Sequence, residues 1–433
     1  MRPSTLCMWL AVGAFAVGTL AIGLDALPDE TGLWLFGALG LLMLADIALS
    51  RARGGWHVAF DGPREIFSGE TGRFTLAVIG RRLPRDLRAR PDWPAGLEGP
   101  EEVRLLPAPD GTLATIELRA RRRGLWPVKR LWLGWSSRLG LVGFCPRLAL
   151  DARVAVVPNI RPVQSGRIDV AVRSALFGVK ENLLRGEGSE FHQLREYVAG
   201  MDPRTIDWKQ SARHRALVAK EMRAERNHHL ILALDNGYLM REEIAGLPKI
   251  DHAINAALAC AWASGLGGDL VGLYAFDSQP RLWLPPEPGR AAFARLRRRT
   301  AELSYRSVET NHTLAIATLH GRLQRRALVV VFSDFVDTTT AELLVENVAV
   351  LSRRHVIVFV ALRDPGLEAI AEAAPDTLTD VARAVSAAEM LRERRLVMGR
   401  LARLGVLVVD AFPQAVTARL VSTYLDIKAR EVV

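Results

Sequence analysis

The chain has 433 residues, enough for about three domains, and its 49% hydrophobic and 24% charged residues exclude a wholly disordered or collagen-like protein. Three widely spaced cysteines without a CxxC pair exclude a disulfide framework, a zinc knuckle and a thioredoxin-type motif. The net charge of +10 permits acidic proteins, anionic lipid or nucleic acid as partners without requiring any of them.

Two long apolar stretches open the chain. Residues 6–24 contain no charged side chain and would form about 28 Å of helix, close to the hydrocarbon thickness of a bilayer. Residues 32–49 form a second stretch, interrupted only by Asp46. A cleaved signal peptide is the alternative for the first stretch, but a second stretch follows at once. We therefore expect a transmembrane helical hairpin over residues 1–54.

The charges around these stretches predict their orientation. The loop over residues 25–30 is acidic and has no lysine or arginine, whereas Arg2, Arg51 and Arg53 lie on the outer flanks. By the positive-inside rule, both ends of the hairpin lie in the cytoplasm, and so does the bulk of the chain. Asp46 is either a functional intramembrane acid or, as we favour, lies near the headgroups close to Arg51 and Arg53.

Residues 55–157 have the sequence pattern of a small antiparallel β-sandwich. Short alternating runs, such as residues 74–78 and 115–118, are separated by glycine and proline, and Asp110-Gly111 is a hairpin signal. Five of the ten tryptophans lie here, and we expect them to fill the core: Trp56, Trp93, Trp126, Trp132 and Trp135. The stretch has no catalytic constellation.

A polar linker over residues 158–188 leads to a dense charged block that keeps neither a strand nor a helix period. Its cations alternate with its acids: Arg195, Arg204, Lys209, Arg213 and Arg215 with Glu190, Glu196, Asp202 and Asp207. The block is either a salt-linked surface or a docking platform in which arginines bind carboxylates. We favour an internal framework with some partner contact. No nucleic acid is expected, because the acids nearly balance the bases.

This block resembles the signature of a bacterial family known as domain of unknown function fifty-eight. The pattern G-x-G-x-E-F-x-x-L-R-x-Y-x-x-G-D-D-P-R-x-I-D-W-K-x-S-A-R is matched closely, with Met201 where an acidic residue is more usual. The segments 139–141, 333–335 and 424–428 agree as well. The candidate signature and partner-binding residues are Glu190, Arg195, Tyr197, Asp202, Arg204, Asp207, Trp208, Lys209 and Arg213.

The resemblance implies a bacterial inner-membrane protein with a von Willebrand factor A-like domain. This domain, with the signature segment, would occupy residues 189–433. The resemblance also implies a MoxR-type AAA ATPase as a partner, together with the membrane or secretory complexes that such a pair assembles. It covers nearly the whole chain but says little about function, because the family is poorly characterised.

The residues themselves also predict an α/β fold. Five continuous apolar runs suit strands of a parallel sheet buried on both faces: residues 229–235, 269–276, 327–333, 355–362 and 405–409. Helical stretches lie between them: residues 250–265, 291–304, 314–325 and 379–403, with a capping box at 339–342. The alternation predicts a doubly wound, Rossmann-like sheet whose ligand site lies beyond the carboxyl ends of the strands.

Three polar residues fall at such ends: Asp235, Thr310 and Asp334. In von Willebrand A domains, an Asp-x-Ser-x-Ser loop, a threonine and a second aspartate hold Mg²⁺, a hard cation that prefers oxygen ligands. Here Gly237 and Leu239 replace the two serines. We therefore expect a degenerate metal site with weak or absent affinity for Mg²⁺, in which the two aspartates could instead cap strand ends.

No phosphate-binding loop, H-E-x-x-H or G-x-S-x-G motif is present. The leading hypothesis is therefore a non-catalytic, membrane-anchored interaction scaffold that works with the ATPase in assembly or maturation of protein complexes. One alternative is a hydrolase that uses the block over residues 195–213. The other is a binder of anionic lipid or nucleic acid, driven by the net charge of +11 on residues 55–433.

Overall fold

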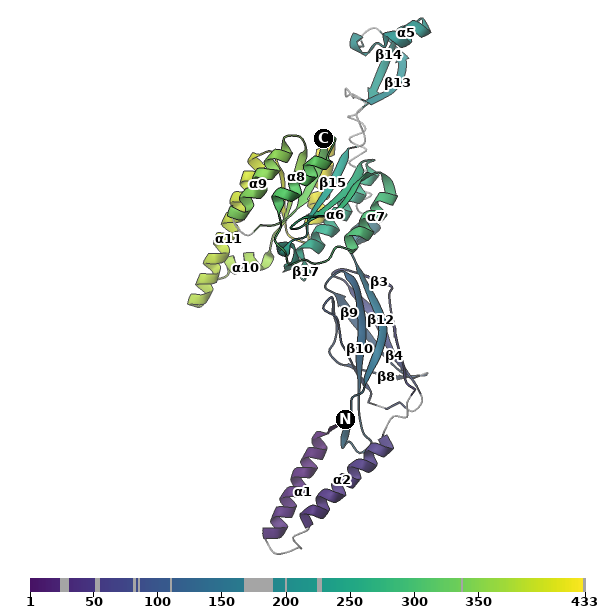
Figure 1. The fold of residues 1–433 in the computed structure, drawn as a ribbon, viewed down its shortest axis with the longest axis vertical. Helices are drawn as coiled ribbons and strands as arrows, with labels where there is room; N and C mark the ends of the chain where they lie inside the picture. Colours follow the sequence, from purple (N-terminus) through teal and green to yellow (C-terminus); the bar gives the residue numbers. More distant parts are fainter. Residues whose placement is uncertain are drawn as a thin grey trace. The chain divides into compact units, whose positions relative to one another are not determined.

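The computed structural model describes residues 1–23, 31–50, 55–80, 83–84, 86–109, 111–166, 190–198, 201–223, 228–335 and 338–430. The chain divides into two compact units, Met1–Val157 and Pro158–Val433. Figure 1 shows helices and a β-rich region in the first unit, and a mixed arrangement of strands and helices in the second. The predicted mixed α/β class is confirmed.

Two apolar helices, α1 (Thr5–Gly23) and α2 (Thr31–Ser50), lie side by side at the start of the first unit (Figure 1). Within the described residues, one helix is long and apolar enough to cross a membrane, over Leu33–Ser50. The apolar part of α1, Thr5–Leu20, is shorter. One candidate span near the N-terminus is thus shown, and a second is not. The acidic loop 25–30, Arg51 and Arg53 lie outside the described residues.

Asp46 joins α2 to the β-rich part of the same unit. Its carboxylate is fully buried and accepts hydrogen bonds from the backbone N–H groups of Leu139 (3.1 Å) and Leu141 (3.4 Å). Ser50, one turn further along α2, accepts a third from the N–H of Arg138 at 2.9 Å. A buried carboxylate needs such donors. Asp46 therefore has a structural role in binding the turn at residues 138–141, and its position near the headgroups stays a prediction.

Two sheets enclose the core of the β-rich part. The first has the order β1-β11-β10-β12-β3 with β5 and β7 attached, and the second the order β2-β4-β9-β6 with β8 attached. The strands of the first are β1 (Arg2–Pro3), β3 (Glu65–Phe67), β5 (Arg88–Pro91), β7 (Val103–Arg104), β10 (Gly124–Ser136), β11 (Val142–Phe144) and β12 (Arg147–Val157). Those of the second are β2 (His57–Asp61), β4 (Thr71–Ile79), β6 (Leu97–Glu98), β8 (Leu106–Ala108) and β9 (Gly111–Ala120).

Alternate residues of these strands point into the shared core, among them Leu76, Ile116 and Leu131, all at most 1% exposed. Of the five tryptophans, Trp135 is buried in this core, and three more pack against it: Trp56, Trp93 and Trp126. The hairpin predicted at residues 110–111 is confirmed, because β8 pairs with β9 and Ala108 lies opposite Gly111. Gly111 has φ +154°, and a Cβ there would lie 2.3 Å from the Val78 carbonyl oxygen.

The second unit is built on a six-stranded sheet of order β19-β18-β15-β20-β21-β22. All neighbours are parallel except β19, which runs antiparallel to β18. The strands are β15 (His229–Asp235), β18 (Leu270–Phe276), β19 (Pro280–Glu287), β20 (Ala327–Phe332), β21 (Val356–Leu362) and β22 (Leu407–Ala411). Two further strands, β16 (Glu243–Ile244) and β17 (Leu247–Pro248), form a small hairpin.

Helices cover both faces of this sheet: α6 (Lys249–Leu266), α7 (Gly289–Ala301), α8 (His312–Arg322), α9 (Thr338–Ser352), α11 (Leu378–Arg403) and α12 (Val416–Ala429). Helix α10 (Pro365–Glu372) packs against α11. Helix α6 packs against α7 and α12, while α9 packs against α8 and α11 (Figure 1). The short helix α3 (Arg161–Gln164) lies in the predicted linker, whose remaining residues from 167 onward are outside the described part.

The five predicted strands are the five parallel strands, within two or three residues at each end. The edge strand β19 was not predicted, because its Pro285 and Pro286 resemble a loop; proline is tolerated in an edge strand. The predicted capping box at residues 339–342 is wrong in position, since α9 already includes Thr338.

A buried histidine makes this unit sensitive to acid. His355 is 3% exposed, and within the described residues neither of its ring nitrogens has a hydrogen-bond partner. Burial first, and then the positive charges of His320, Arg354 and Arg326, lower the pKa of His355 to about 4. The unfolded chain binds the proton near pH 6.5, so stability falls as the pH drops from about 6.5 towards 4.

We expect the substitution His355→Leu to remove this acid sensitivity. The variant should gain up to about 3 kcal/mol over the wild type between pH 7 and pH 4.5, because it has no imidazole to protonate. Urea unfolding of both proteins across this pH range measures the difference. Parallel stability curves for the two proteins would contradict the prediction.

Candidate functional site

The carboxyl edge of the parallel sheet gathers side chains from the ends of β15 and β20 and from the loop before α8. Asp235 ends β15 and is 2% exposed. Its Oδ1 accepts hydrogen bonds from Thr310 Oγ1 at 2.6 Å and from the Gly237 N–H at 2.8 Å, and its Oδ2 accepts one from Ser333 Oγ at 2.6 Å. The structure thus brings two of the three predicted metal ligands, Asp235 and Thr310, into direct contact with each other.

Asp334, the third predicted ligand, is held by two cations of the chain itself. Its Oδ2 lies 2.7 Å from Lys249 Nζ, and its Oδ1 accepts hydrogen bonds from Arg394 Nη1 and the Phe335 N–H, both at 3.0 Å. Lys249 also binds Glu242 at 2.6 Å, and Arg394 binds Asp410 at 3.0 Å. We call Glu242, Lys249, Asp334, Arg394 and Asp410 the ion-pair network.

The charge on Lys249 is maintained despite its burial. Desolvation acts against the ammonium group, but the carboxylates of Asp334 and Glu242 more than offset it, so the pKa of Lys249 is raised. Lys249 therefore supplies a positive charge to Asp334 at neutral pH.

These contacts do not fit Mg²⁺. Both oxygens of Asp334 already bind donors, and the replaced residues Gly237 and Leu239 carry no side-chain oxygen. A Cβ at position 237 would lie 2.0 Å from Thr310 Oγ1, so a serine has no room there. Within the described residues no three His, Cys, Asp or Glu side chains are placed to hold a metal. Mg²⁺ requires near-octahedral oxygen ligation, which this edge does not offer.

His312 and Ser333 belong to the same edge and were not predicted as site residues. His312 Nε2 lies 3.0 Å from Ser333 Oγ and 3.5 Å from Asp235 Oδ2. One ring nitrogen thus faces both the hydroxyl and the carboxylate, whereas a catalytic triad uses the two nitrogens separately. Ser333 is also only 1% exposed. The three side chains form a hydrogen-bonded cluster, and this geometry does not make Ser333 a nucleophile.

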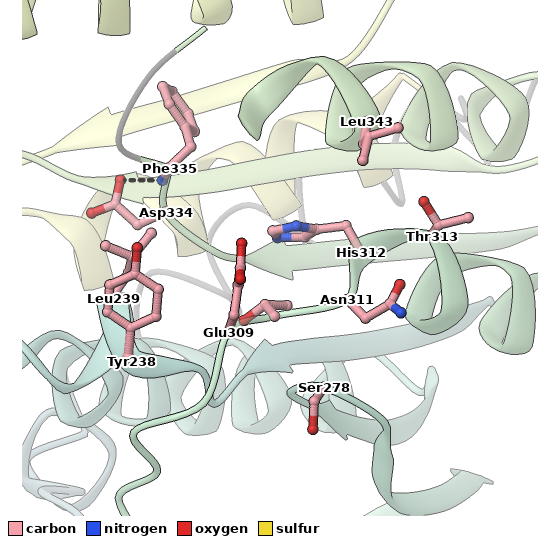
Figure 2. A pocket seen from close by; sticks show the side chains of 11 residues that line it. Tyr238, Leu239, Ser278, Glu309, Asn311, His312, Thr313, Asp334, Phe335 and Leu343 are labelled. Atoms are coloured by element: carbon pink, nitrogen blue, oxygen red, sulfur yellow. Dashed lines mark hydrogen bonds between the residues drawn. The ribbon is translucent and has the colours of Figure 1, made fainter. Parts of the chain in front are cut away.

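A cavity of about 440 Å³ opens beside this cluster. It is lined by residues that follow β15, β18 and β20 and by residues around the start of α8: Tyr238, Leu239, Ser278, Glu309, Thr310, Asn311, His312, Thr313, Asp334, Phe335 and Leu343. Figure 2 shows the cavity with Glu309 and His312 near the centre of the view, Tyr238 and Leu239 at the left, and Leu343 at the upper right. We call it the carboxyl-edge cavity.

The charged block forms a small module of its own. Strands β13 (Glu190–Glu196) and β14 (Val218–Arg223) pair antiparallel, with the 3-10 helix η1 (Pro203–Thr205) and helix α5 (Trp208–His214) between them. The Tyr197 hydroxyl donates to the Met201 carbonyl at 3.0 Å. Residues 186–189 of the signature, and the side chain of Glu190, lie outside the described part.

Two signature aspartates act as helix caps in this module. Asp202 accepts from the N–H of Arg204, and Asp207 accepts from the N–H groups of Lys209 and Gln210, at 2.9, 3.1 and 3.1 Å. The hydrogen bond from Gln210, helped by Lys220 at 3.2 Å, keeps the pKa of Asp207 below its usual value. The carboxylates of Asp202 and Asp207 thus hold the backbone of this module together.

The remaining signature side chains of the module face outward. Trp208 is 70% exposed, and Arg204, Lys209 and Arg213, which lie within five residues of it in the sequence, are exposed as well. Arg195 contacts Met201 through its guanidinium, 3.3 Å from the sulfur. We call Trp208, Arg204, Lys209 and Arg213 the Trp208 surface. The aspartate caps could have been predicted from the segments Asp-Pro-Arg and Asp-Trp-Lys, because aspartate before a short helix is a common cap.

The second unit is therefore an α/β domain with a hydrogen-bonded polar cluster at its carboxyl edge and an appended hairpin module. Residues 193–402 match the family described as "Protein of unknown function DUF58". Uncharacterized proteins of Mycobacterium bovis and of two Mycobacterium tuberculosis strains are 26% identical over 204 residues, 46% of this chain. The chain spans 63% of the length of these curated relatives.

A solved structure is also similar in part. It is a conserved hypothetical protein named BatB from Bacteroides thetaiotaomicron, 10% identical, with a TM-score of 0.30. The similarity covers 47% of this chain and all of that one. A TM-score of this size supports no conclusion about fold or function.

Proposed function

We propose that this chain is a membrane-anchored, non-catalytic interaction scaffold that works with a MoxR-type AAA ATPase in the assembly or maturation of membrane or secretory protein complexes. Its anchor would be the α1–α2 hairpin in a bacterial inner membrane, with both helices spanning and the rest of the chain in the cytoplasm. Its sheet would belong to a von Willebrand A-like domain that has lost its metal. The candidate span in α2 and the position of Asp235, Thr310 and Asp334 support these two points.

The Trp208 surface is the observation that carries the proposal. A tryptophan exposed by 70% leaves a large apolar area in water, and tryptophan and arginine dominate the energetic centres of protein interfaces. The nearest signature acids, Asp202 and Asp207, are already used as caps. These two carboxylates keep their negative charge, but Arg204, Lys209 and Arg213 outnumber them, and the excess positive charge suits an acidic patch on the partner.

Co-purification tests this function. The full chain, extracted in detergent and mixed with a MoxR-type ATPase under ATP-trapping conditions, should retain the ATPase. The substitution Trp208→Ala should weaken retention about thirtyfold, the effect of losing an interface centre worth about 2 kcal/mol.

The matched control is Leu125→Ala, which removes an apolar side chain that is 60% exposed in the β-rich unit. This variant should retain the ATPase like the wild type. Equal retention by wild type and Trp208→Ala, or no retention at all, would refute the proposal. If Trp208→Ala instead bound anionic vesicles less well than the wild type but still retained the ATPase, the result would favour the lipid-binding alternative.

A further inference from the structure

The carboxyl-edge cavity carries negative charge that the chain does not neutralise. Its lining includes two carboxylates, Glu309 and Asp334, and no lysine or arginine. The negative charge of Asp334 is balanced by its ion pairs with Lys249 and Arg394. Glu309 is exposed and has no ion pair within the described part of the chain. One carboxylate therefore faces the open cavity without a cation.

A second, buried carboxylate strengthens this negative field. Asp235 accepts hydrogen bonds from three neutral donors: two hydroxyl groups and one backbone N–H. The Nε2 atom of His312, a residue that lines the cavity, lies 3.5 Å from Asp235 Oδ2. A buried charge is screened little by solvent, so a cation in the cavity would be attracted by both Asp235 and Glu309.

The walls restrict which cation fits. Leu239, Phe335 and Leu343 contribute apolar surface, and Tyr238 contributes an aromatic ring. A volume of about 440 Å³ accepts a side chain together with some neighbouring backbone. Lysine and arginine combine an apolar stem with a cationic head, which matches apolar walls around a carboxylate. An acidic side chain would instead meet Glu309 with no metal between the two negative charges.

We propose that the carboxyl-edge cavity binds a lysine or arginine side chain from a protein partner, with the cationic head on Glu309 and the stem against Leu239 and Leu343. The site is separate from the Trp208 surface and needs no metal ion. This proposal depends only on the residues that line the cavity and not on the identity of the ATPase.

Peptide binding to the full chain in detergent tests this inference. The probes are fluorescein-labelled Gly-Gly-Arg-Gly-Gly and the same peptide with citrulline, which keeps the shape of arginine but is neutral. Fluorescence anisotropy should show at least tenfold tighter binding of the arginine peptide to the wild type. The substitution Glu309→Gln should abolish this preference, and Glu372→Gln, an exposed carboxylate on α10, should preserve it.

Each other outcome overturns the inference. Equal affinity for the two peptides, or an unchanged preference in Glu309→Gln, would show that Glu309 does not select the positively charged side chain. Displacement of the peptide by millimolar Mg²⁺, but not by NaCl of equal ionic strength, would assign the cavity to a metal. The Trp208→Ala variant should bind the arginine peptide like the wild type, so failure of the scaffold proposal and failure of this one are distinguishable.

Discussion

The substitution Lys249→Met is expected to lower the free energy of unfolding of the α/β unit by about 3–5 kcal/mol. Lys249 is buried between Asp334 and Glu242, 2.7 and 2.6 Å from their carboxylates. Methionine keeps the length of the side chain but removes the charge, which leaves the buried Asp334 with Arg394 as its one cation. Removing one partner of a buried ion pair lowers the free energy of unfolding by this amount, because the other charge remains inside the protein with too few counter-charges.

Urea unfolding of the full chain in detergent, followed by tryptophan fluorescence, measures this loss. The matched control is Arg299→Met, which breaks the exposed pair with Glu302 and should change stability by less than about 1 kcal/mol. Adding Asp334→Asn to Lys249→Met should recover part of the loss. If Lys249→Met were as stable as the wild type, the ion-pair network would not hold this edge together.

The substitution Asp269→Ala is expected to destabilise the same unit by about 3 kcal/mol. Asp269, 2% exposed, accepts hydrogen bonds from the Tyr424 hydroxyl at 2.5 Å and from Lys428 Nζ at 2.6 Å. Both donors lie on α12, and burial together with the charge of Asp269 raises the pKa of Tyr424. Alanine would remove this acceptor from the buried Tyr424 hydroxyl and would leave the Lys428 ammonium group with the Gly267 carbonyl oxygen, at 2.7 Å, in place of a carboxylate.

The chain offers a control within the same segment. Asp426 lies between Tyr424 and Lys428 but is exposed, so Asp426→Ala should change stability by less than about 0.5 kcal/mol. Thermal unfolding of the three proteins at neutral pH compares them directly. Equal melting temperatures for Asp269→Ala and Asp426→Ala would show that the contact between α12 and Asp269 contributes no stability.

Some elements of the fold could be predicted from the sequence and others could not. The parallel strands were predicted because a strand buried on both faces is a continuous apolar run, as in residues 327–332 and 356–362. Strand β19 was not predicted, because its prolines are typical of a loop as well as of an edge strand. Its antiparallel direction depends on its pairing with β18, which is a tertiary contact. The contacts of Asp46 with Leu139 and Leu141 could not be predicted, because they join residues 93 and 95 positions apart.

The site was predicted only where its residues follow strand ends. Asp235 and Asp334 could be found this way, because each comes at the end of an apolar run. Lys249 and Arg394 could not, because their contacts with Asp334 join residues separated by 85 and 60 positions. Nothing local in α6 or α11 marks them as partners of Asp334. The signature segment was recognised as a pattern, but its division into capping acids and outward-facing cations required the fold.

Cross-linking from position 208 tests the scaffold account most directly. Trp208 is replaced by the photo-reactive amino acid p-benzoylphenylalanine in the full chain, and membranes containing it are irradiated with the MoxR-type ATPase and ATP. The account predicts a covalent adduct with the ATPase that depends on ATP and that does not form when the same group is placed at the exposed Leu125. Adducts of equal yield from both positions, or none from position 208 while the protein remains folded, would contradict it.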